Sequence, residues 1–171
     1  GFNLRVLMRT GKKADLMTRV TDGFGARSSV VYDTIANPAV HTRSWGHVYP
    51  QRSVTSKLWV VSELHDDDGI GGVRTRTYRY EGGVRDVTGA GFLGFQARIC
   101  VEKETGIETR TTYEPHHHIG HGAYPFAGLP ITETLRIPLG GGVLRVVTTT
   151  TEYVVRPHPS SEPWFVIPKK I

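Results

Sequence analysis

Short runs of β-branched and aromatic residues alternate along this chain with turns rich in glycine, and no stretch sustains the 3.6-residue period of an amphipathic helix. The runs typical of strands occupy 26–33, 58–64, 73–80, 96–102, 107–113, 132–137 and 143–155. Residues 41–56 show no clear period. The pattern predicts an all-β fold, made predominantly of antiparallel hairpins that form an extended or curved sheet.

One order of residues recurs, with drifting spacing: a glycine turn, then an arginine, then Thr or β-branched residues, then a tyrosine. It occurs at Gly23…Arg27…Tyr32, Gly69…Arg74…Tyr78, Gly106…Arg110…Tyr113 and Gly142…Arg145…Tyr153. Because the spacing is not constant, this is no strict repeat. The recurrence predicts a series of similar two-stranded hairpins, each placed beside the last.

Residues 78–95 form the most distinctive stretch, because a strand with alternating faces leads there into clustered glycines and aromatics. Closely spaced glycines allow positive φ and close backbone approach, and the aromatic side chains supply surface to bury. We therefore predict a bent strand corner against which other strands pack. Its structural signature residues are Tyr78, Tyr80, Gly89, Gly91, Phe92, Gly94 and Phe95.

The composition indicates many turns and a thin or extended core. The chain has 171 residues, of which 38% are hydrophobic, and it holds 20 Gly and 10 Pro. We expect one all-β region over 1–155, followed by a Pro-rich extended tail over 156–171. The first residues look like the middle of a polypeptide, so we expect a fragment of a longer protein. No run is apolar for long enough to predict a direct membrane span.

Charge and cysteine content narrow the classes of function. The net charge of +5 is interspersed, with arginines alternating with threonines as on a solvated β face. Nucleic-acid binding favours a basic stripe with accessible aromatics, so we expect no nucleic-acid partner. Cys100 is the only cysteine, which excludes an internal disulfide and fits folding in a reducing compartment.

Taken together, several blocks of this sequence resemble the middle region of bacterial insecticidal toxin-complex B components, which are RHS-related proteins that include the virulence plasmid B proteins. The glycine-aromatic signature Gly89-Ala90-Gly91-Phe92-Leu93-Gly94-Phe95 is the strongest of these blocks. The others are Asp22-Gly23-Phe24-Gly25-Ala26-Arg27, Tyr49-Pro50, Leu58-Trp59-Val60-Val61, Asp68-Gly69-Ile70-Gly71-Gly72, Thr77-Tyr78-Arg79-Tyr80-Glu81-Gly82, Thr105-Gly106, Thr111-Thr112-Tyr113 and Tyr124-Pro125-Phe126-Ala127-Gly128-Leu129-Pro130. The resemblance runs from about Leu16 to Val155.

The resemblance implies a structural role without enzymatic activity and without a cofactor. B components of this family join a C component to form a hollow β-sheet shell around a toxic polypeptide, and a β-propeller docks the shell to the A-component translocation channel. The region resembled here would belong to the shell wall or flank the propeller. The implied setting is a secreted or cell-surface bacterial toxin assembly that folds in the cytoplasm before release.

The histidine-rich loop and three other groups are the candidates for chemistry. His116, His117, His118 and His121 could ligate a metal and serve a metal enzyme, but consecutive histidines in an extended loop point in different directions. The hypothesis we favour there is a solvated loop without a metal. Asp66-Asp67-Asp68-Gly69 resembles a calcium loop but lacks the later Glu, and so predicts a hairpin turn.

Two further groups have structural interpretations. Glu102-Lys103-Glu104 has a Glu-x-Glu spacing without the other parts of a transferase site, and Cys100 has no His partner nearby in sequence. A remaining alternative is a surface β domain that binds a glycan or a protein. Its candidate contacts are the aromatic side chains of Trp45, Tyr49, Trp59 and Trp164.

Overall fold

The computed structural model describes residues 16–55, 58–119, 123–156 and 165–169, and these residues form strands, turns and loops without a helix. The strands are β1 (Arg19–Thr21), β2 (Arg27–Thr34), β3 (His41–Thr42), β4 (Gln51–Ser53), β5 (Trp59–Asp67), β6 (Val73–Glu81), β7 (Val84–Asp86), β8 (Phe92–Gly94), β9 (Ala97–Glu102), β10 (Glu108–Tyr113), β11 (Pro130–Gly140), β12 (Val143–Thr150), β13 (Tyr153–Arg156) and β14 (Phe165–Pro168). The predicted all-β class is therefore confirmed.

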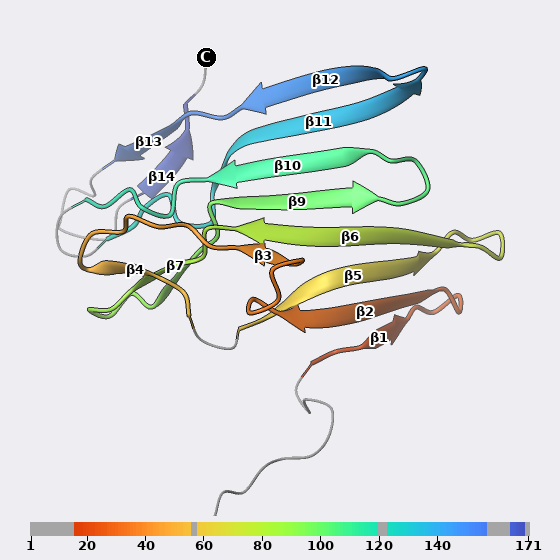
Figure 1. Ribbon diagram of the computed structural model, residues 1–171, viewed down its shortest axis with the longest axis horizontal. Helices are drawn as coiled ribbons and strands as arrows, with labels where there is room; N and C mark the ends of the chain where they lie inside the picture. Colours follow the sequence, from red (N-terminus) through yellow and green to blue (C-terminus); the bar gives the residue numbers. More distant parts are fainter. Residues whose placement is uncertain (1–15, 56–57, 120–122, 157–164, 170–171) are drawn as a thin grey trace, which may run out of the picture.

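Most of the strands belong to one open, nine-stranded sheet. Eight of them follow the order β1-β2-β5-β6-β9-β10-β11-β12, and the ninth, β3, pairs with β6 outside this order. Every pairing along this path is antiparallel, as the hairpin pattern predicts. Tight turns join β1 to β2, β5 to β6, β9 to β10 and β11 to β12. Figure 1 shows all of these turns on the right, where the strands of the sheet end. The sheet does not close into a barrel.

Two smaller sheets lie on the left in Figure 1, near the opposite ends of these strands. β4, β7 and β8 form a three-stranded sheet, and β13 pairs with β14 (Figure 1). The segment between β2 and β5 also returns to the main sheet, where β3 pairs in parallel with the end of β6 at Tyr80 and Glu81. Because β5 pairs only with Val73–Thr77, β6 changes partner from β5 to β3 along one of its sides.

The main core lies where the segment between β2 and β5 folds against the end of the main sheet. Ile35, Val40, Val54 and Val60 are buried there, with Leu58, Tyr80 and Phe95 packed against them. The Tyr80 hydroxyl donates to the Val61 carbonyl at 2.9 Å, and burial raises the pKa of Tyr80 to about 12. The phenol is therefore a neutral donor inside this core at physiological pH.

The structure corrects one local prediction and adds two short strands that the sequence did not predict. The single strand predicted over 143–155 is wrong: β12 ends at Thr150, and β13 begins at Tyr153 in another sheet. Its partner β11 begins at Pro130, which has no N–H with which to extend the ladder. Residues 41–56 contain β3 and β4, which have two and three residues and are too short to show a period.

β12 forms one outer edge of the main sheet, and all of its residues are exposed. Val143, Leu144, Val146 and Val147 place apolar surface on that strand. No helix among the described residues has the length and hydropathy needed to cross a membrane.

Because few apolar side chains are buried, we predict that the free energy of unfolding depends strongly on a small number of positions. Val84 in β7 is 0% exposed, whereas Val143 at the start of β12 is 58% exposed. Val84→Ala should lower the free energy of unfolding by about 2 kcal/mol, because it removes two buried carbons and leaves a cavity. The matched Val143→Ala should change it by less than about 0.5 kcal/mol. Urea denaturation of both variants checks this, and equal effects would contradict it.

Candidate functional site

The corner over residues 82–96 leaves β6, forms the β7–β8 hairpin and returns as β9. Gly91 and Gly94 have φ values of 75° and 107°, a region that other residues rarely adopt. Gly82 has φ 61°, and a Cβ built there would lie 1.8 Å from the Gln96 side-chain oxygen. The corner therefore needs glycine both for backbone conformation and for close approach.

The buried carboxylate of Asp86 holds the glycine turn of this corner in place. Its side chain is 2% exposed, and Oδ1 accepts the backbone N–H groups of Thr88 at 2.7 Å, Gly89 at 2.9 Å and Ala90 at 3.3 Å. The Thr88 hydroxyl donates to the same oxygen at 2.8 Å. The other oxygen, Oδ2, accepts the Tyr124 hydroxyl at 2.7 Å. One carboxylate thus joins the corner to the loop before β11.

These hydrogen bonds also set the ionisation of the pair. The Tyr124 hydroxyl, together with the hydroxyl and N–H of Thr88 and the Ala90 N–H, lowers the pKa of Asp86 to about 2 although burial opposes this shift. Burial, with the hydrogen bond to Asp86, raises the pKa of Tyr124. At neutral pH an ionised acceptor therefore faces a protonated donor, which is a strong form of hydrogen bond.

The aromatic members of the predicted signature are partly brought together. The Phe95 ring lies 4.7 Å from Tyr80 and 5.3 Å from Phe92 between ring centroids. His41 adds a fourth ring at 5.8 Å from Phe95. Tyr78 is placed elsewhere, opposite Cys100 in the β6–β9 ladder. The corner is therefore centred on Phe95.

His41, which the sequence did not single out, bridges two segments beneath this cluster. It is buried; its Nδ1 lies 3.1 Å from the Ile35 carbonyl oxygen, and the Gly83 N–H donates to its Nε2 at 3.3 Å. This pairing requires the neutral tautomer with the proton on Nδ1. Burial lowers the pKa of His41, and nearby Arg43 adds to the shift. The imidazole acts as a structural bridge between β3 and the corner.

His116 makes a second bridge, between two glutamines. Its Nε2 contacts the Gln96 amide nitrogen, and its Nδ1 lies 3.2 Å from the Gln51 amide oxygen. The Gln51 amide nitrogen in turn donates to the His116 carbonyl at 2.8 Å. Burial, followed by nearby His47, lowers the pKa of His116. The loop is thereby fixed to β4 on one side and to the start of β9 on the other.

The other described members of the histidine loop pack against aromatic rings in tilted arrangements. His117 lies 4.6 Å from Phe126 and His118 lies 5.3 Å from Tyr124, measured between ring centroids. His121 falls outside the described residues. Within the ranges that the structure describes, no three His, Cys, Asp or Glu side chains form a group that could hold a metal ion.

The remaining acidic candidates serve turns and ladders. Asp66 pairs with Arg76 at 3.0 Å, while Asp68 Oδ1 accepts the N–H groups of Ile70 and Gly72 at 2.9 and 2.8 Å. Glu104 accepts the Thr75 N–H at 2.8 Å. In the Glu-x-Glu run, Glu102 accepts the hydroxyl of Thr105. Cys100 is a half-buried free thiol.

The aromatic contact candidates differ in exposure. Trp45 is 83% exposed and Tyr49 is 71% exposed, and Val48 between them is also exposed. Trp59 is less exposed, at 37%, and Trp164 lies outside the described residues. The loop before β4 therefore presents apolar side chains that can contact another surface.

Residues 3–119 match the family model described as the insecticide toxin TcdB middle/N-terminal region. The match includes the complete glycine-aromatic corner and Asp86, while Tyr124 lies beyond it. Neither the curated proteins nor the solved structures gave a significant match.

The Asp86–Tyr124 pair predicts a specific response to acid. Because the folded pKa of Asp86 is about 2 and an unfolded Asp has a pKa near 3.9, the ionised carboxylate stabilises the fold above the unfolded value, and this contribution is lost as pH falls through about 2. Tyr124→Phe should lower the urea midpoint at pH 7, and its deficit should shrink between pH 5 and pH 2. Tyr32→Phe, which loses an exposed hydroxyl bond to the Met17 carbonyl, should show no such narrowing. A constant Tyr124→Phe deficit would contradict the pairing.

The Gly82 contact gives a second prediction. Gly82→Ala should lower the free energy of unfolding by about 2 kcal/mol or more, because a Cβ at positive φ would also displace Gln96 from His116. Gly23→Ala is the control, since its φ is not positive and no atom lies within 4 Å of an added Cβ. Comparable denaturation curves for the two variants would show that the close approach is not required.

Proposed function

This chain belongs to the family of the insecticide toxin TcdB middle/N-terminal region, and from that membership we propose that it is a non-enzymatic segment of the β-sheet shell with which a toxin-complex B component encloses and delivers a toxic polypeptide. The match confirms the toxin-complex B resemblance seen in the sequence. A structural role in a toxin follows from the family; shell formation and delivery are our proposal.

The observation that carries the proposal is the open main sheet. Its hairpins are laid down in chain order from β1 to β12, and its described core lies at one end (Figure 1). Most described residues of this sheet are exposed or half-buried, which suits a wall better than the centre of a compact enzyme. The residues of β12 are exposed along the whole strand.

The backbone of β12 supports a continuation of this wall. Thr151 donates its N–H to the Ile131 carbonyl at 2.8 Å, which fixes the alternation along the preceding strand. Accordingly Val147 and Thr149 direct their N–H groups towards β11, and Leu144, Val146 and Thr148 direct theirs outward. An exposed edge of this kind is a template for another strand. We propose that a neighbouring strand of the shell pairs with it.

A role without catalysis is supported by the use of the buried polar groups. The buried Asp86 and His41, together with the half-buried His116, are each engaged in hydrogen bonds that join segments of the fold. We propose no cofactor or metal for the described residues.

Family membership implies assembly with other toxin-complex components. We propose that these are the C component and the A-component channel, that the polypeptide is RHS-related, and that it is secreted after cytoplasmic folding. We also propose that residues 1–155 form one region and 156–171 an extended tail, whose strand β14 pairs with β13 at the end of that region.

The edge-pairing proposal can be tested in the toxin polypeptide that carries this region. Val146→Pro removes an outward N–H without removing a β11–β12 hydrogen bond, so the sheet should still fold while a neighbouring strand loses its donor. We expect at least about tenfold less assembled, protease-protecting shell when the B and C components are combined. Protection of the enclosed polypeptide from added protease measures this.

Val146→Thr is the matched control, because it keeps the backbone N–H of residue 146 and reduces the apolar surface of the side chain. It should assemble as the unmodified protein does. If Val146→Pro folds and protects the enclosed polypeptide equally well, β12 is not a paired edge of the wall.

A further inference from the structure

Three basic side chains across the middle of one face of the main sheet pair with carboxylates from other strands of the sheet. Lys103 lies 3.3 Å from Glu63, Arg136 lies 2.8 Å from Glu108, and Arg110 donates to both oxygens of Glu81. The register places Glu63, Thr77, Val101, Glu108 and Arg136 in one row across the sheet. Lys103, Arg110 and Arg136 therefore each have a carboxylate partner on this face of the sheet.

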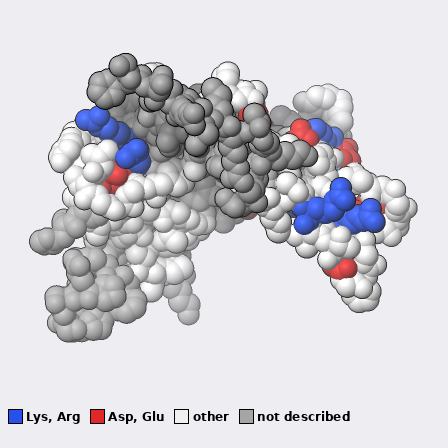
Figure 2. Space-filling model, turned by 90° about the horizontal axis from the view of Figure 1, so that it is seen from below, with Lys and Arg blue, Asp and Glu red and all other residues white. Residues whose placement is uncertain are grey.

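The β1–β2 end of the same face breaks this rule. Arg19 is opposite Ser29 and Arg27 is opposite Thr21, so the two arginines occupy diagonal positions of one antiparallel pair. Among the described residues, neither guanidinium lies within ion-pair distance of a carboxylate. Like charges at neighbouring sheet positions oppose each other unless an anion lies between them. Figure 2 shows Lys and Arg side chains on the right, the side on which Figure 1 places the β1–β2 turn, and a second group at the upper left.

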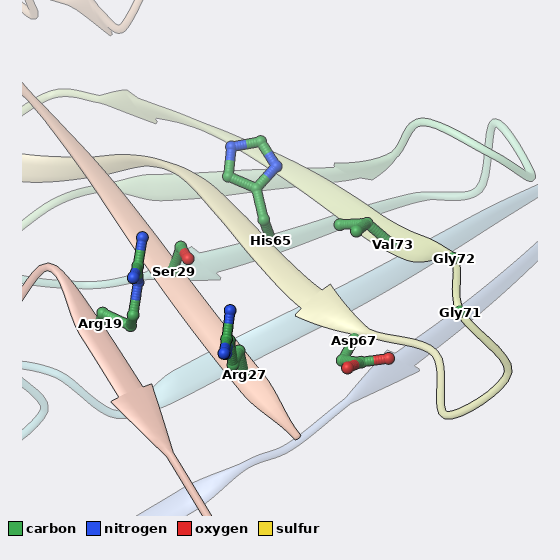
Figure 3. Close-up of a pocket in the computed structure, with 8 residues that line it drawn as sticks. All are labelled: Arg19, Arg27, Ser29, His65, Asp67, Gly71, Gly72 and Val73. Carbon is green, nitrogen blue, oxygen red and sulfur yellow. The ribbon is translucent and has the colours of Figure 1, made fainter. Parts of the chain in front are cut away.

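These arginines line an open cavity of about 310 Å³. In the close-up of Figure 3, both guanidiniums, the Ser29 hydroxyl and the His65 ring project to the same side from β1, β2 and β5. The glycines of the β5–β6 turn and Val73 complete the lining. The cavity is thus a polar shelf made by three neighbouring strands and closed on one side by a turn.

Some residues that line the cavity already form hydrogen bonds or ion contacts within the protein, so only the others can donate to a ligand. His65 contacts Glu63 at 3.2 Å and Thr75 at 3.2 Å, and Asp67 Oδ1 accepts the Gly69 N–H at 3.0 Å. By contrast, the Ser29 hydroxyl has no hydrogen-bond partner within the described ranges. The available donors are therefore the two guanidiniums and the Ser29 hydroxyl.

We propose that this shelf is a binding site for a carboxylate, with Arg19 and Arg27 as the charged donors and Ser29 as the third donor. A guanidinium presents paired N–H groups that match the two oxygens of a planar carboxylate. Two arginines and Asp67 give the shelf a net charge of +1. One carboxylate neutralises this charge, whereas a phosphate dianion would exceed it and lie beside Asp67.

The carboxylate can come from a free dicarboxylic acid or from an acidic side chain of a polypeptide, since both present the same group. This proposal goes beyond the shell function and does not rest on it. A failure to bind carboxylates would leave the β12 edge proposal intact, and the reverse also holds.

Titration of the protein with glutarate, an Asp/Glu-containing peptide and inorganic phosphate, followed by NMR of the arginine side-chain resonances, tests the site. We expect saturable shifts with glutarate and the peptide, binding at least about tenfold weaker for phosphate, and weakening as salt is raised. Arg19→Gln/Arg27→Gln should weaken carboxylate binding by at least about tenfold, because charge-assisted hydrogen bonds are lost. Tighter binding of the peptide than of glutarate identifies a polypeptide as the source; equal binding identifies the free acid.

The double variant Arg85→Gln/Arg145→Gln is the matched control, because it removes the same charge from exposed arginines outside the cavity. It should bind glutarate as the unmodified protein does. The proposal is overturned by equal losses in both double variants, by phosphate binding as tightly as glutarate, or by the absence of saturable shifts. Thermal melting without ligand confirms that each variant is folded.

Discussion

The whole structure depends on the limited apolar burial that a single open sheet allows. Away from its left end in Figure 1, the main sheet is held by backbone pairing and by side chains that stay half-exposed. Apolar volume is concentrated around Val60, Tyr80 and Phe95, where the segment between β2 and β5 folds over β6. Phe95 contacts both Tyr80 and Phe92, so the same ring connects the main sheet to the β4–β7–β8 sheet. The position of the small sheet is thereby tied to the main core.

Hydrogen-bonded polar groups also connect the main sheet to the β4–β7–β8 sheet, and we call this connection the Phe95 joint. Asp86, His41 and His116 each accept hydrogen bonds from one segment and contact another. Buried and half-buried polar groups of this kind specify a single arrangement, because any shift leaves a donor or acceptor unsatisfied. The acid sensitivity expected of Asp86 and the neutral states of the two histidines have this common origin. The joint is held by geometry as much as by hydrophobic area.

The sequence was sufficient for the parts of the fold that are local. Alternation along 73–80 and the glycine turns located the hairpins and the all-β class, and the clustered glycines located the corner. The anchor of the corner was missed because its partner Tyr124 is 38 residues from Asp86 in sequence. A local sequence signal did exist, namely an aspartate at the start of a glycine turn. In the structure Asp22, Asp68 and Asp86 each occupy such a position and accept backbone N–H groups from the residues two and four positions later. His41 and Gln96 carried no such pattern, since their contacts are set by packing.

The shared edge that holds the tight turns has a practical consequence for protein engineering. Because these turns lie at the edge away from the core, additional residues at the Gly140–Gly142 turn would extend into solvent without crossing the Phe95 joint. An epitope or a fluorescent reporter placed there would mark one border of the sheet while leaving strand order and register unchanged. The molecule therefore offers a labelling position on the side of the main sheet opposite the β7 strand that carries the buried Asp86 carboxylate.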